Sequence, residues 1–378
     1  MLESLTLTNF KAFSRQRIGL EPFTLLTGLN SSGKSSVLQS LALLRQSYES
    51  GDLTPVGDTE AGLLLNGELV QLGTGQDVRY EFYDEHGPHI SLDVQGDGAS
   101  ARWSATYEQE ADHLKLLAEE NQPPRDAASL AALLPTLFGP GFQYLKADRI
   151  SPQVSYPRSH HAVSSRGFLG PQGEHTVNYL RAHQDDEVTS EHLRIEDAAS
   201  FALLDQTRAW MQKLCPGVSL EASGIAGTDT VRLSYTFGSG ASRSNAYRPT
   251  NVGFGLTYVL PIVVACLSSK PGSLILLENP EAHLHPQGQT WMAYLAGAAV
   301  AGGAQIVMET HSDHVLNGLR LEVKKGRLPA EATAVHYFRR DGHTSEVVSP
   351  VIASDGTLSE WPVGFFDEWE NSLDQLLD

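Results

Sequence analysis

Residues 28–35 (GLNSSGKS) constrain the fold of this chain more than any other part of its sequence. They fit the spacing G-x-x-x-x-G-K-[ST], in which glycines let the backbone turn tightly so that its N–H groups face phosphate groups. An apolar run at residues 23–26 precedes the motif, and apolar positions at helical spacing follow it, namely Val37, Leu38, Leu41 and Leu44. This context predicts a strand, a phosphate-binding loop and a helix, and disfavours a mere glycine- and serine-rich turn.

A loop of this type makes specific demands on its side chains. Lys34 supplies a point charge to the β and γ phosphates, and Ser35 offers its hydroxyl group to Mg²⁺. We therefore expect ATP and Mg²⁺ as cofactors. The predicted nucleotide-binding residues of the loop are Asn30, Ser31, Ser32, Gly33, Lys34, Ser35 and Ser36.

Two later apolar runs end in polar residues. Residues 274–277 (LILL) are followed by Glu278, and residues 304–308 are followed by Glu309, Thr310 and His311. Parallel strands buried on both faces have such continuous apolar runs, and open α/β sheets bind ligands at the carboxyl ends of their strands. We therefore predict that Glu278 is the metal-side acid and that Ser35 and Glu278 are the metal-binding residues.

The remaining sequence suggests how the chain is organised. Short β-like segments at residues 63–83 and 90–107 predict a strand-rich arm, residues 112–137 and 189–214 look helical, and strands alternate with helices after residue 251. The predicted regions are an N-terminal lobe of the ATPase core (1–150), an insertion or lid (151–240), a C-terminal lobe (241–320) and a C-terminal segment (321–378).

Charge argues against a nucleic-acid footprint over the whole surface. Lysine and arginine total 27 against 45 aspartates and glutamates, which gives a formal net charge of −18. Any nucleic-acid contact must therefore be local. Ordinary solvated surface explains the candidate patch better than a nucleic-acid contact does. The patch comprises Lys324, Lys325, Arg327, Arg339 and Arg340.

Cysteine content and hydropathy bear on the compartment. Cys215 and Cys266 are too few for a disulfide framework or a thiolate metal site, which suits the reducing cytoplasm. The longest apolar run, residues 256–267, contains Pro261 and is shorter than the roughly 20 residues needed to span a bilayer. We therefore expect a cytoplasmic protein that does not enter the membrane.

Four segments together resemble the ABC-type ATPases of the SMC, RecF and overcoming-lysogenization-defect group. They are residues 28–35, 251–255 (NVGFG), 276–286 (LLENPEAHLHP) and 309–320 (ETHSDHVLNGLR), and residues 361–367 (WPVGFFD) resemble the C-terminal segment of a prokaryotic AAA family ATPase branch. The resemblance implies an α/β P-loop NTPase fold of the ABC or SMC-head type, with a mixed sheet, a β-rich arm and a helical insertion. Members of the group are known mostly from DNA repair and antiphage defence.

The resemblance also implies roles for individual residues. Asn251, Gly253 and Gly255 match the signature that reaches across a dimer to the partner's γ phosphate, although the usual Ser-Gly-Gly core is not present. His311 matches the switch histidine that senses the γ phosphate. The implied assembly is a homodimer or higher oligomer with ATP in the interface, acting with a separately encoded effector such as a nuclease.

One position departs from the group's pattern. Asn279 occupies the place of the catalytic glutamate that usually follows the metal-side acid. An amide cannot accept a proton as a general base, so either Glu281 serves through a different loop geometry or hydrolysis is slow. We predict slow turnover with Glu281 or Glu278 helping. The alternative is an ATP-locked scaffold or inhibitor that holds a partner protein, whereas the degenerate signature disfavours a transporter subunit.

Three further patterns leave alternatives open. His283 and His285, with the acids and histidines of residues 309–314, have the spacing of metal ligands in a nuclease, but neither stretch has a full ligand set. Arg149 either faces nucleotide or a partner or pairs with an acid. The aromatic tail at residues 361–369 either packs on the core or forms a partner site.

Overall fold

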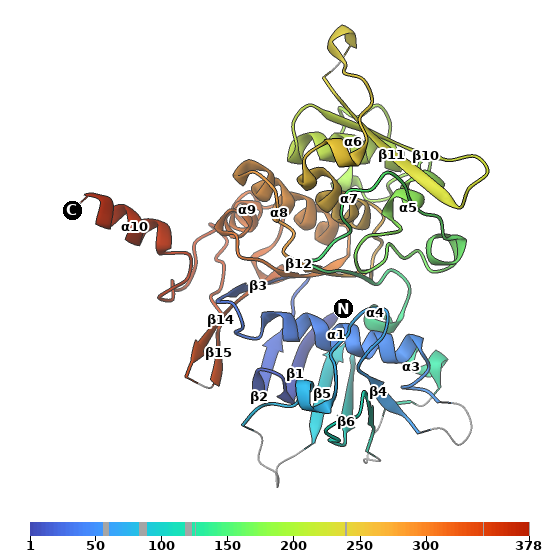
Figure 1. The fold of residues 1–378 in the computed structure, drawn as a ribbon. Coiled ribbons are helices and arrows are strands. Elements are labelled where there is room, and N and C mark those ends of the chain that lie inside the picture. Colours follow the sequence, from blue (N-terminus) through green and yellow to red (C-terminus); the bar gives the residue numbers. More distant parts are fainter. Residues whose placement is uncertain are drawn as a thin grey trace. The chain divides into compact units, whose positions relative to one another are not determined.

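The computed structural model describes residues 1–55, 60–82, 89–117, 123–124, 126–238, 240–342 and 344–377 (Figure 1). The chain divides into two compact units. The first unit comprises Met1–Gly139, Thr333–Val351 and Leu358–Asp378, and the second comprises Pro140–Ala332 and Ile352–Thr357. The chain therefore leaves the first unit after Gly139 and returns to it at Thr333.

An antiparallel sheet with the strand order β2-β1-β5-β6 forms one layer of the first unit. Its strands are β1 (Leu2–Phe10), β2 (Phe13–Gly19), β5 (Ile90–Gly96) and β6 (Ala99–Ala105). Leu5 and Leu7 of β1 are fully buried, as expected for alternate residues that share one face of a strand. Strands β5 and β6 confirm the β-rich character that the sequence predicts for residues 90–107.

A second group of strands in the first unit leads into the predicted loop. Strand β3 (Phe23–Gly28) pairs in parallel with β14 (Thr333–Asp341), and β14 pairs antiparallel with β15 (Thr344–Val348). Helix α1 (Lys34–Glu49) begins directly after the loop and buries its apolar stripe. The predicted succession of strand, loop and helix is confirmed. The smaller elements of this unit are β4 (Gly62–Leu64), α2 (Gly75–Val78), β7 (His113–Lys115), α3 (Ala127–Leu133), α4 (Pro135–Phe138) and α10 (Glu368–Leu377).

The helical prediction for residues 112–137 is correct only for the last part of the segment. His113–Lys115 form strand β7, which pairs antiparallel with β4, so a contact with a distant segment overrides the local helical pattern. Among the described residues of this segment, helix structure is limited to α3 and α4, and Asp126 caps the first of them by accepting a hydrogen bond from the Ser129 amide. Residues 118–122 and 125 of the predicted helix lie outside the described residues.

A parallel sheet forms the centre of the second unit. Strand β12 (Leu274–Glu278) lies between β8 (Gln143–Leu145) and β13 (Gln305–Glu309). Almost every residue of β12 and β13 is buried, as the continuous apolar runs predict. The register pairs Glu278 with Glu309, so both strands end at the same edge.

Helices pack against this sheet within the second unit. They include α7 (Phe254–Leu267), which is apolar on all sides and largely buried, and α8 (Pro286–Ala301), which also packs against α9 (Asp313–Lys324). A second, antiparallel sheet has the order β10-β11-β9, and further helices belong to this unit. These elements are β9 (Tyr156–Pro157), α5 (Thr176–Ala182), α6 (Leu203–Leu214), β10 (Val218–Gly224) and β11 (Thr230–Phe237).

The predicted helix over residues 189–214 is correct only from Leu203 onward, apart from a single turn at Glu191–Leu193. The buried side chain of Gln206 explains the irregular part. Its amide oxygen accepts a hydrogen bond from Ile195 N, and its amide nitrogen donates to the Ser200 carbonyl oxygen. These bonds satisfy backbone groups that a helix would otherwise pair internally.

Candidate nucleotide-binding site

Two glycines give the predicted phosphate-binding loop its backbone path. Gly28 has a φ of +128° and Gly33 a φ of +105°, values that disfavour any residue with a side chain. A Cβ atom at Gly28 would lie 2.0 Å from the Phe338 carbonyl oxygen, and one at Gly33 would lie 2.4 Å from Cζ of Phe13. Both positions of the motif therefore require glycine for conformation and for space.

The loop wraps around its own lysine. Lys34 is only 3% exposed, and its Nζ donates hydrogen bonds to the carbonyl oxygens of Gly28 (3.1 Å) and Leu29 (2.7 Å). Ser32 Oγ also donates to the Leu29 oxygen, at 2.6 Å. Because α1 begins at Lys34 and Gly33 has no side chain with which to cap it, the positive end of the helix faces the loop.

The remaining residues of the loop differ in exposure. Asn30 and Ser31 are exposed, Ser35 is half-buried and Ser36 is buried. A cavity of about 240 Å³ adjoins the loop at Ser31 within the first unit. Its lining includes three cationic side chains and a tyrosine ring, namely Lys11, Arg79, Arg340 and Tyr80.

The predicted metal-side acid is held at the end of β12 in the second unit. Its Oε1 accepts a hydrogen bond from the Tyr144 hydroxyl group at 2.5 Å, and its Oε2 accepts one from the Ala147 amide at 3.1 Å. Burial and, after it, the charge of Glu278 raise the pKa of Tyr144, so this phenol stays protonated and donates. The sequence analysis missed this contact.

A tight turn after β12 brings Glu281 and His311 together. Glu281 Oε1 accepts a hydrogen bond from His311 N at 2.9 Å, whereas the buried Oε2 has no hydrogen-bond partner among the described residues. Asn279 has a φ of 43°, and its amide donates to the Glu309 carbonyl oxygen at 2.9 Å. The turn thus joins the ends of β12 and β13.

Arg149 differs from both of its sequence interpretations. It is 3% exposed, and its guanidinium group donates to the carbonyl oxygens of Lys146, Glu278 and Asn279, each at 2.8 Å. Burial lowers the pKa of Arg149 to about 10, and the charge of Glu281 opposes that shift. Arg149 therefore stabilises the backbone of the turn that carries the candidate acids.

The signature-like segment also lies beside this turn. Asn251 ends a single helical turn, Gly253 caps the start of α7, and both are exposed. A Cβ atom at Gly255 would lie 2.6 Å from the His283 carbonyl oxygen. The rings of Phe254 and His283 are 6.0 Å apart, and Phe254 is 53% exposed. The start of α7 and His283 are thus neighbours within the second unit.

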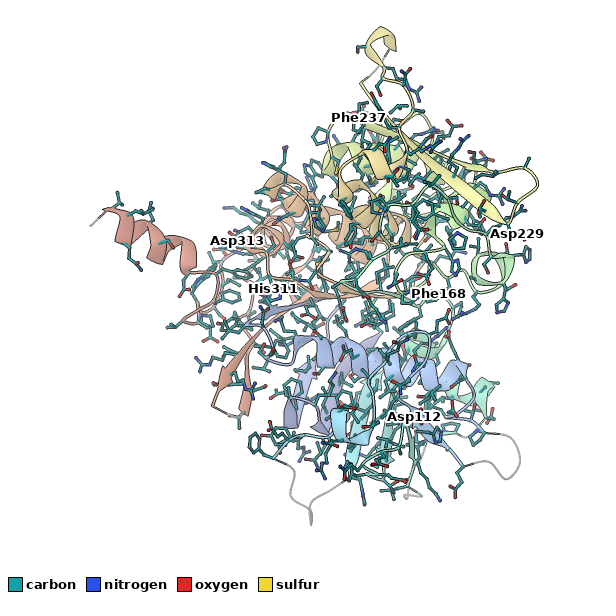
Figure 2. All side chains as sticks on the ribbon, viewed as in Figure 1. Asp112, Phe168, Asp229, Phe237, His311 and Asp313 are labelled. Carbon is teal, nitrogen blue, oxygen red and sulfur yellow. The ribbon has the colours of Figure 1, made fainter. Side chains whose placement is uncertain are left out.

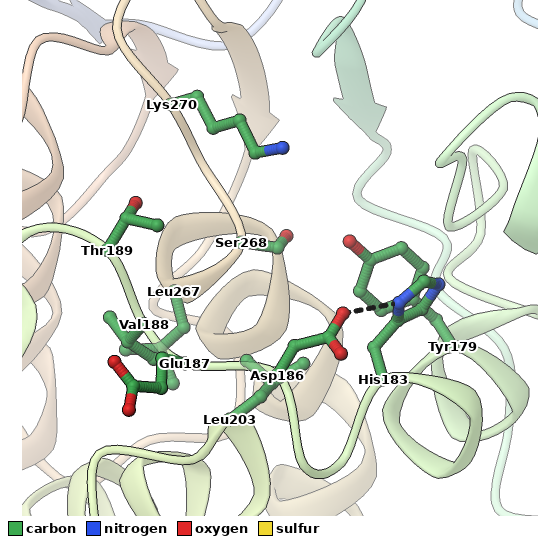
Figure 3. A pocket seen from close by; sticks show the side chains of 10 residues that line it. All are labelled: Tyr179, His183, Asp186, Glu187, Val188, Thr189, Leu203, Leu267, Ser268 and Lys270. Atoms are coloured by element: carbon green, nitrogen blue, oxygen red, sulfur yellow. Dashed lines mark hydrogen bonds and ion pairs between the residues drawn. The ribbon is translucent and has the colours of Figure 1, made fainter.

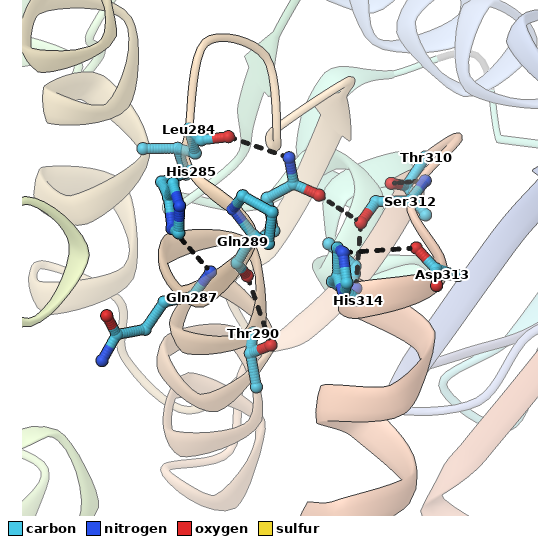
Figure 4. Close-up of polar contacts among 11 residues, drawn as sticks. Leu284, His285, Gln287, Gln289, Thr290, Thr310, Ser312, Asp313 and His314 are labelled. Atoms are coloured by element: carbon cyan, nitrogen blue, oxygen red, sulfur yellow. Dashed lines mark hydrogen bonds and ion pairs between the residues drawn. The ribbon is translucent and has the colours of Figure 1, made fainter.

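Hydrogen bonds tie the start of α9 to the start of α8 (Figure 4). Ser312 Oγ accepts a bond from Val315 N, which caps α9, and donates to Gln289 Oε1 at 2.6 Å. Gln289 in turn donates to the Leu284 carbonyl oxygen at 2.9 Å. His311 and Asp313 lie at this end of α9 (Figure 2).

The residues present suit magnesium better than a nuclease metal centre. The described part of the chain contains no group of three or more histidine, cysteine, aspartate or glutamate side chains arranged to hold a metal. Mg²⁺ in nucleotide sites usually takes one or two carboxylates and completes its shell with phosphate oxygens and water. The Glu278 carboxylate at the end of β12 fits that requirement.

Another cavity lies elsewhere in the second unit (Figure 3). It has a volume of about 210 Å³ and is lined by residues that include Tyr179, His183 and Asp186. His183 Nδ1 lies 2.8 Å from an Asp186 carboxylate oxygen, and the His183 ring packs against Tyr179. None of the predicted site residues lines this cavity.

Residues of the candidate basic patch belong to both units. Lys325 lies over the Tyr294 ring, and Arg327 pairs with the buried Glu322, both in the second unit. Arg339 pairs with Glu346 in the first unit. Much of the patch is therefore engaged in intramolecular contacts.

The aromatic tail is partly buried. Phe365 is fully buried and packs against Tyr337, Trp361 and Phe366. Trp361 remains 47% exposed, and the side chain of Trp369 lies outside the described residues. Of the two alternatives for the aromatic tail, packing on the core applies to Phe365.

Two protein families match separate parts of the chain. Residues 23–317, more than half of the chain, match the family described as "AAA domain, putative AbiEii toxin, Type IV TA system". The chain belongs to this AAA domain family. Residues 328–376 match a second family, a "Protein of unknown function (DUF3696)". No curated protein matches the sequence.

Solved structures similar to this AAA domain chain are heads of SMC proteins. An SMC head bound to the C-terminal winged-helix domain of ScpA is 15% identical, with a TM-score of 0.54, over 93% of this chain and 98% of that one. An SMC head with an extended coiled coil, bound to the C-terminal domain of ScpA from Pyrococcus furiosus, is 13% identical, with a TM-score of 0.52, over 100% and 99%. This AAA domain protein thus has the mixed α/β P-loop NTPase fold of SMC heads, as the sequence predicts. Across its described residues, no helix has the length and hydropathy needed to cross a bilayer.

Proposed function

We propose that this AAA domain protein is a Mg²⁺-dependent, ATP-hydrolysing switch that works as a homodimer or higher oligomer. The observation that carries the proposal is the loop between β3 and α1, where Gly28 and Gly33 adopt conformations reserved for glycine around the buried Lys34. Such a loop binds phosphate through its backbone N–H groups and the helix N-terminus. Asn30, Ser31, Ser32 and Ser36 would line the same phosphate cradle.

Each candidate residue has a proposed part in the reaction. Lys34 would neutralise charge on the β and γ phosphates, and Ser35 and Glu278 would hold Mg²⁺. The metal ion would supply positive charge to the phosphates. Glu281 would accept the proton of the attacking water, since its Oε2 is buried without a hydrogen-bond partner among the described residues, while its Oε1 is bonded to His311 N. His311 would then report the γ phosphate to this turn.

Dimerisation is supported by the exposure of the signature-like segment. Asn251, Gly253 and Phe254 are exposed at the start of α7, so a second subunit can reach them. We propose that this segment, with Gly255, contacts the nucleotide of the partner subunit. ABC-type sites are completed in this way, according to the resemblance seen in the sequence.

The proposed setting is a prokaryotic antiphage-defence or DNA-repair system in the cytoplasm. The matched family is described in terms of a toxin of a type IV toxin–antitoxin system, and SMC heads of similar fold are bound to a separate protein, ScpA. We propose that this chain likewise acts with a separately encoded effector, such as a nuclease. Nucleic acid would enter only through a local patch, because the chain has a net charge of −18.

A second candidate function is an ATP-locked scaffold or inhibitor that hydrolyses little. Asn279 supports it, because the position that usually carries the catalytic glutamate cannot act as a base here.

Steady-state phosphate release over a range of protein concentrations, with Lys34→Ala as the control, separates the two functions. Specific activity that rises with concentration and disappears in Lys34→Ala supports the dimeric enzyme. Tight ATP binding without phosphate release at any concentration supports the scaffold and contradicts the enzyme.

A further inference from the structure

A buried arginine, Arg149, is hydrogen-bonded to the backbone of the turn after β12. The guanidinium group of Arg149 donates to the carbonyl oxygens of Glu278 and Asn279 at 2.8 Å each. These are the last carbonyl of the strand and the first carbonyl of the turn. Arg149 Nε is buried and has no hydrogen-bond partner among the described residues. A buried N–H group without a partner costs free energy, which the hydrogen bonds of the guanidinium group to carbonyl oxygens must offset.

The turn itself has an uncommon backbone conformation. Asn279 has a φ of 43°, in the left-handed region that asparagine tolerates better than most residues. The backbone N–H group of Asn279 donates to the Glu309 carbonyl oxygen, and its backbone carbonyl oxygen accepts a hydrogen bond from Arg149. Contacts on both sides therefore fix the direction in which the chain leaves Glu278.

Strand register explains how Tyr144 reaches the acid. Tyr144 of β8 is paired with Leu276 of β12, and Glu278 lies two residues beyond Leu276 on the same face. The Tyr144 hydroxyl group then donates to Oε1 at 2.5 Å while the Ala147 amide donates to Oε2 at 3.1 Å. Each oxygen of the carboxylate therefore has one donor, and each retains a lone pair.

We propose that Arg149 and Tyr144 are positioning residues for Glu278. Arg149 fixes the backbone at Glu278 and Asn279, and Tyr144, with the Ala147 amide, fixes the carboxylate before the metal arrives. This inference rests on the proposed function, because it assigns the carboxylate to Mg²⁺. It adds that the cost of ordering the carboxylate is met in the free protein, so that the metal binds a side chain already held in place.

The expected effect of losing the hydroxyl group is limited and measurable. Tyr144→Phe leaves the carboxylate held only by the Ala147 amide. Metal binding must then order the side chain further and should weaken roughly 2- to 10-fold, up to the cost of one immobilised side chain. Arg149→Lys retains a positive charge but loses the planar fork that spans two carbonyl oxygens, so we expect a larger loss. Neither residue belongs to the phosphate-binding loop, so the affinity for metal-free nucleotide should not change.

The test uses the full chain and a fluorescent ATP analogue. Nucleotide affinity is measured first in EDTA and then over a Mg²⁺ titration for the wild type, Tyr144→Phe and Arg149→Lys. Tyr156→Phe is the matched control, because Tyr156 is also buried and its hydroxyl group accepts a bond from the Gln153 amide. Melting temperatures identify any variant that fails to fold.

The inference predicts that the Mg²⁺ midpoint rises in Tyr144→Phe, rises further in Arg149→Lys and stays constant in Tyr156→Phe, while the affinity in EDTA is unchanged for every variant. If the wild type binds nucleotide in a Mg²⁺-dependent manner but Tyr144→Phe has the wild-type midpoint, the positioning role is wrong and the proposed function stands. If the wild type binds no nucleotide, or binds it without any response to Mg²⁺, the proposed function fails and the inference fails with it.

Discussion

Glu281→Gln tests which acid performs the chemistry. Glutamine keeps the size of the side chain and an oxygen that can accept the 2.9 Å bond from His311 N, so the turn after β12 should keep its geometry. The substitution changes only Oε2, which is buried and has no hydrogen-bond partner among the described residues. It therefore removes the proton acceptor without disturbing a hydrogen bond.

The expected magnitude follows from that chemistry. A positioned general base contributes about 10²- to 10⁴-fold to a rate, so turnover should fall at least about 100-fold, a loss of roughly 2.7 kcal/mol of transition-state stabilisation. ATP affinity and melting temperature should stay close to those of the wild type. Phosphate release at saturating ATP measures the first quantity, and titration with a fluorescent nucleotide measures the second.

Asn279→Glu provides the control. It returns an acid to the position that carries the base in the wider group, and combined with Glu281→Gln it should recover part of the lost turnover. Turnover of Glu281→Gln within about threefold of the wild type, far below the loss expected for a general base, would refute the assignment if ATP still binds. The scaffold function would gain support if the wild type bound ATP without turnover and Asn279→Glu were the one variant that hydrolysed it.

Three further variants test separate parts of the structure. Gly28→Ala should abolish ATP binding and lower the melting temperature, because its Cβ would lie 2.0 Å from the Phe338 carbonyl oxygen, whereas Gly51→Ala, also at positive φ but with nothing within 4 Å, should leave binding intact. Ser312→Ala should cost about 1 kcal/mol of unfolding free energy in chemical denaturation, since it removes the cap of α9, and Ser312→Thr should restore most of it. Burial lowers the pKa of His336, so the unfolded chain binds more protons below about pH 6.5 and stability should fall as the pH drops through that value. Melting temperatures at pH 7.5 and 5.5 should therefore differ more for the wild type than for His336→Gln, and equal differences would contradict this cause.

Local patterns predicted the central elements of both units. The continuous apolar run of β12 and its terminal acid are both local signals, and the structure places each of them as expected. The glycines of the phosphate-binding loop are a local signal too, because their conformation is set by the loop they form. Such features depend on a few neighbouring residues and can be read from the sequence alone.

Contacts between distant residues could not be read in this way. Tyr144 and Glu278 are far apart in the sequence and meet only because β8 pairs with β12 in one register. The three carbonyl contacts of Arg149 depend on the same pairing and on the left-handed turn at Asn279. Helix propensity misled the prediction for residues 112–137, where pairing of β7 with β4 prevailed.

Equilibrium binding of ATP by the purified chain, compared with Lys34→Ala, tests the central claim most directly. Lys34 is held by the carbonyl oxygens of Gly28 and Leu29, so its loss should remove the charge that attracts phosphate while leaving the fold of the loop's neighbours intact. Isothermal titration calorimetry in the presence of Mg²⁺ should show saturable binding to the wild type and binding at least tenfold weaker to Lys34→Ala, a difference of about 1.4 kcal/mol. Equal binding to both proteins, or no binding to the wild type, would contradict the assignment of residues 28–35 as the nucleotide site.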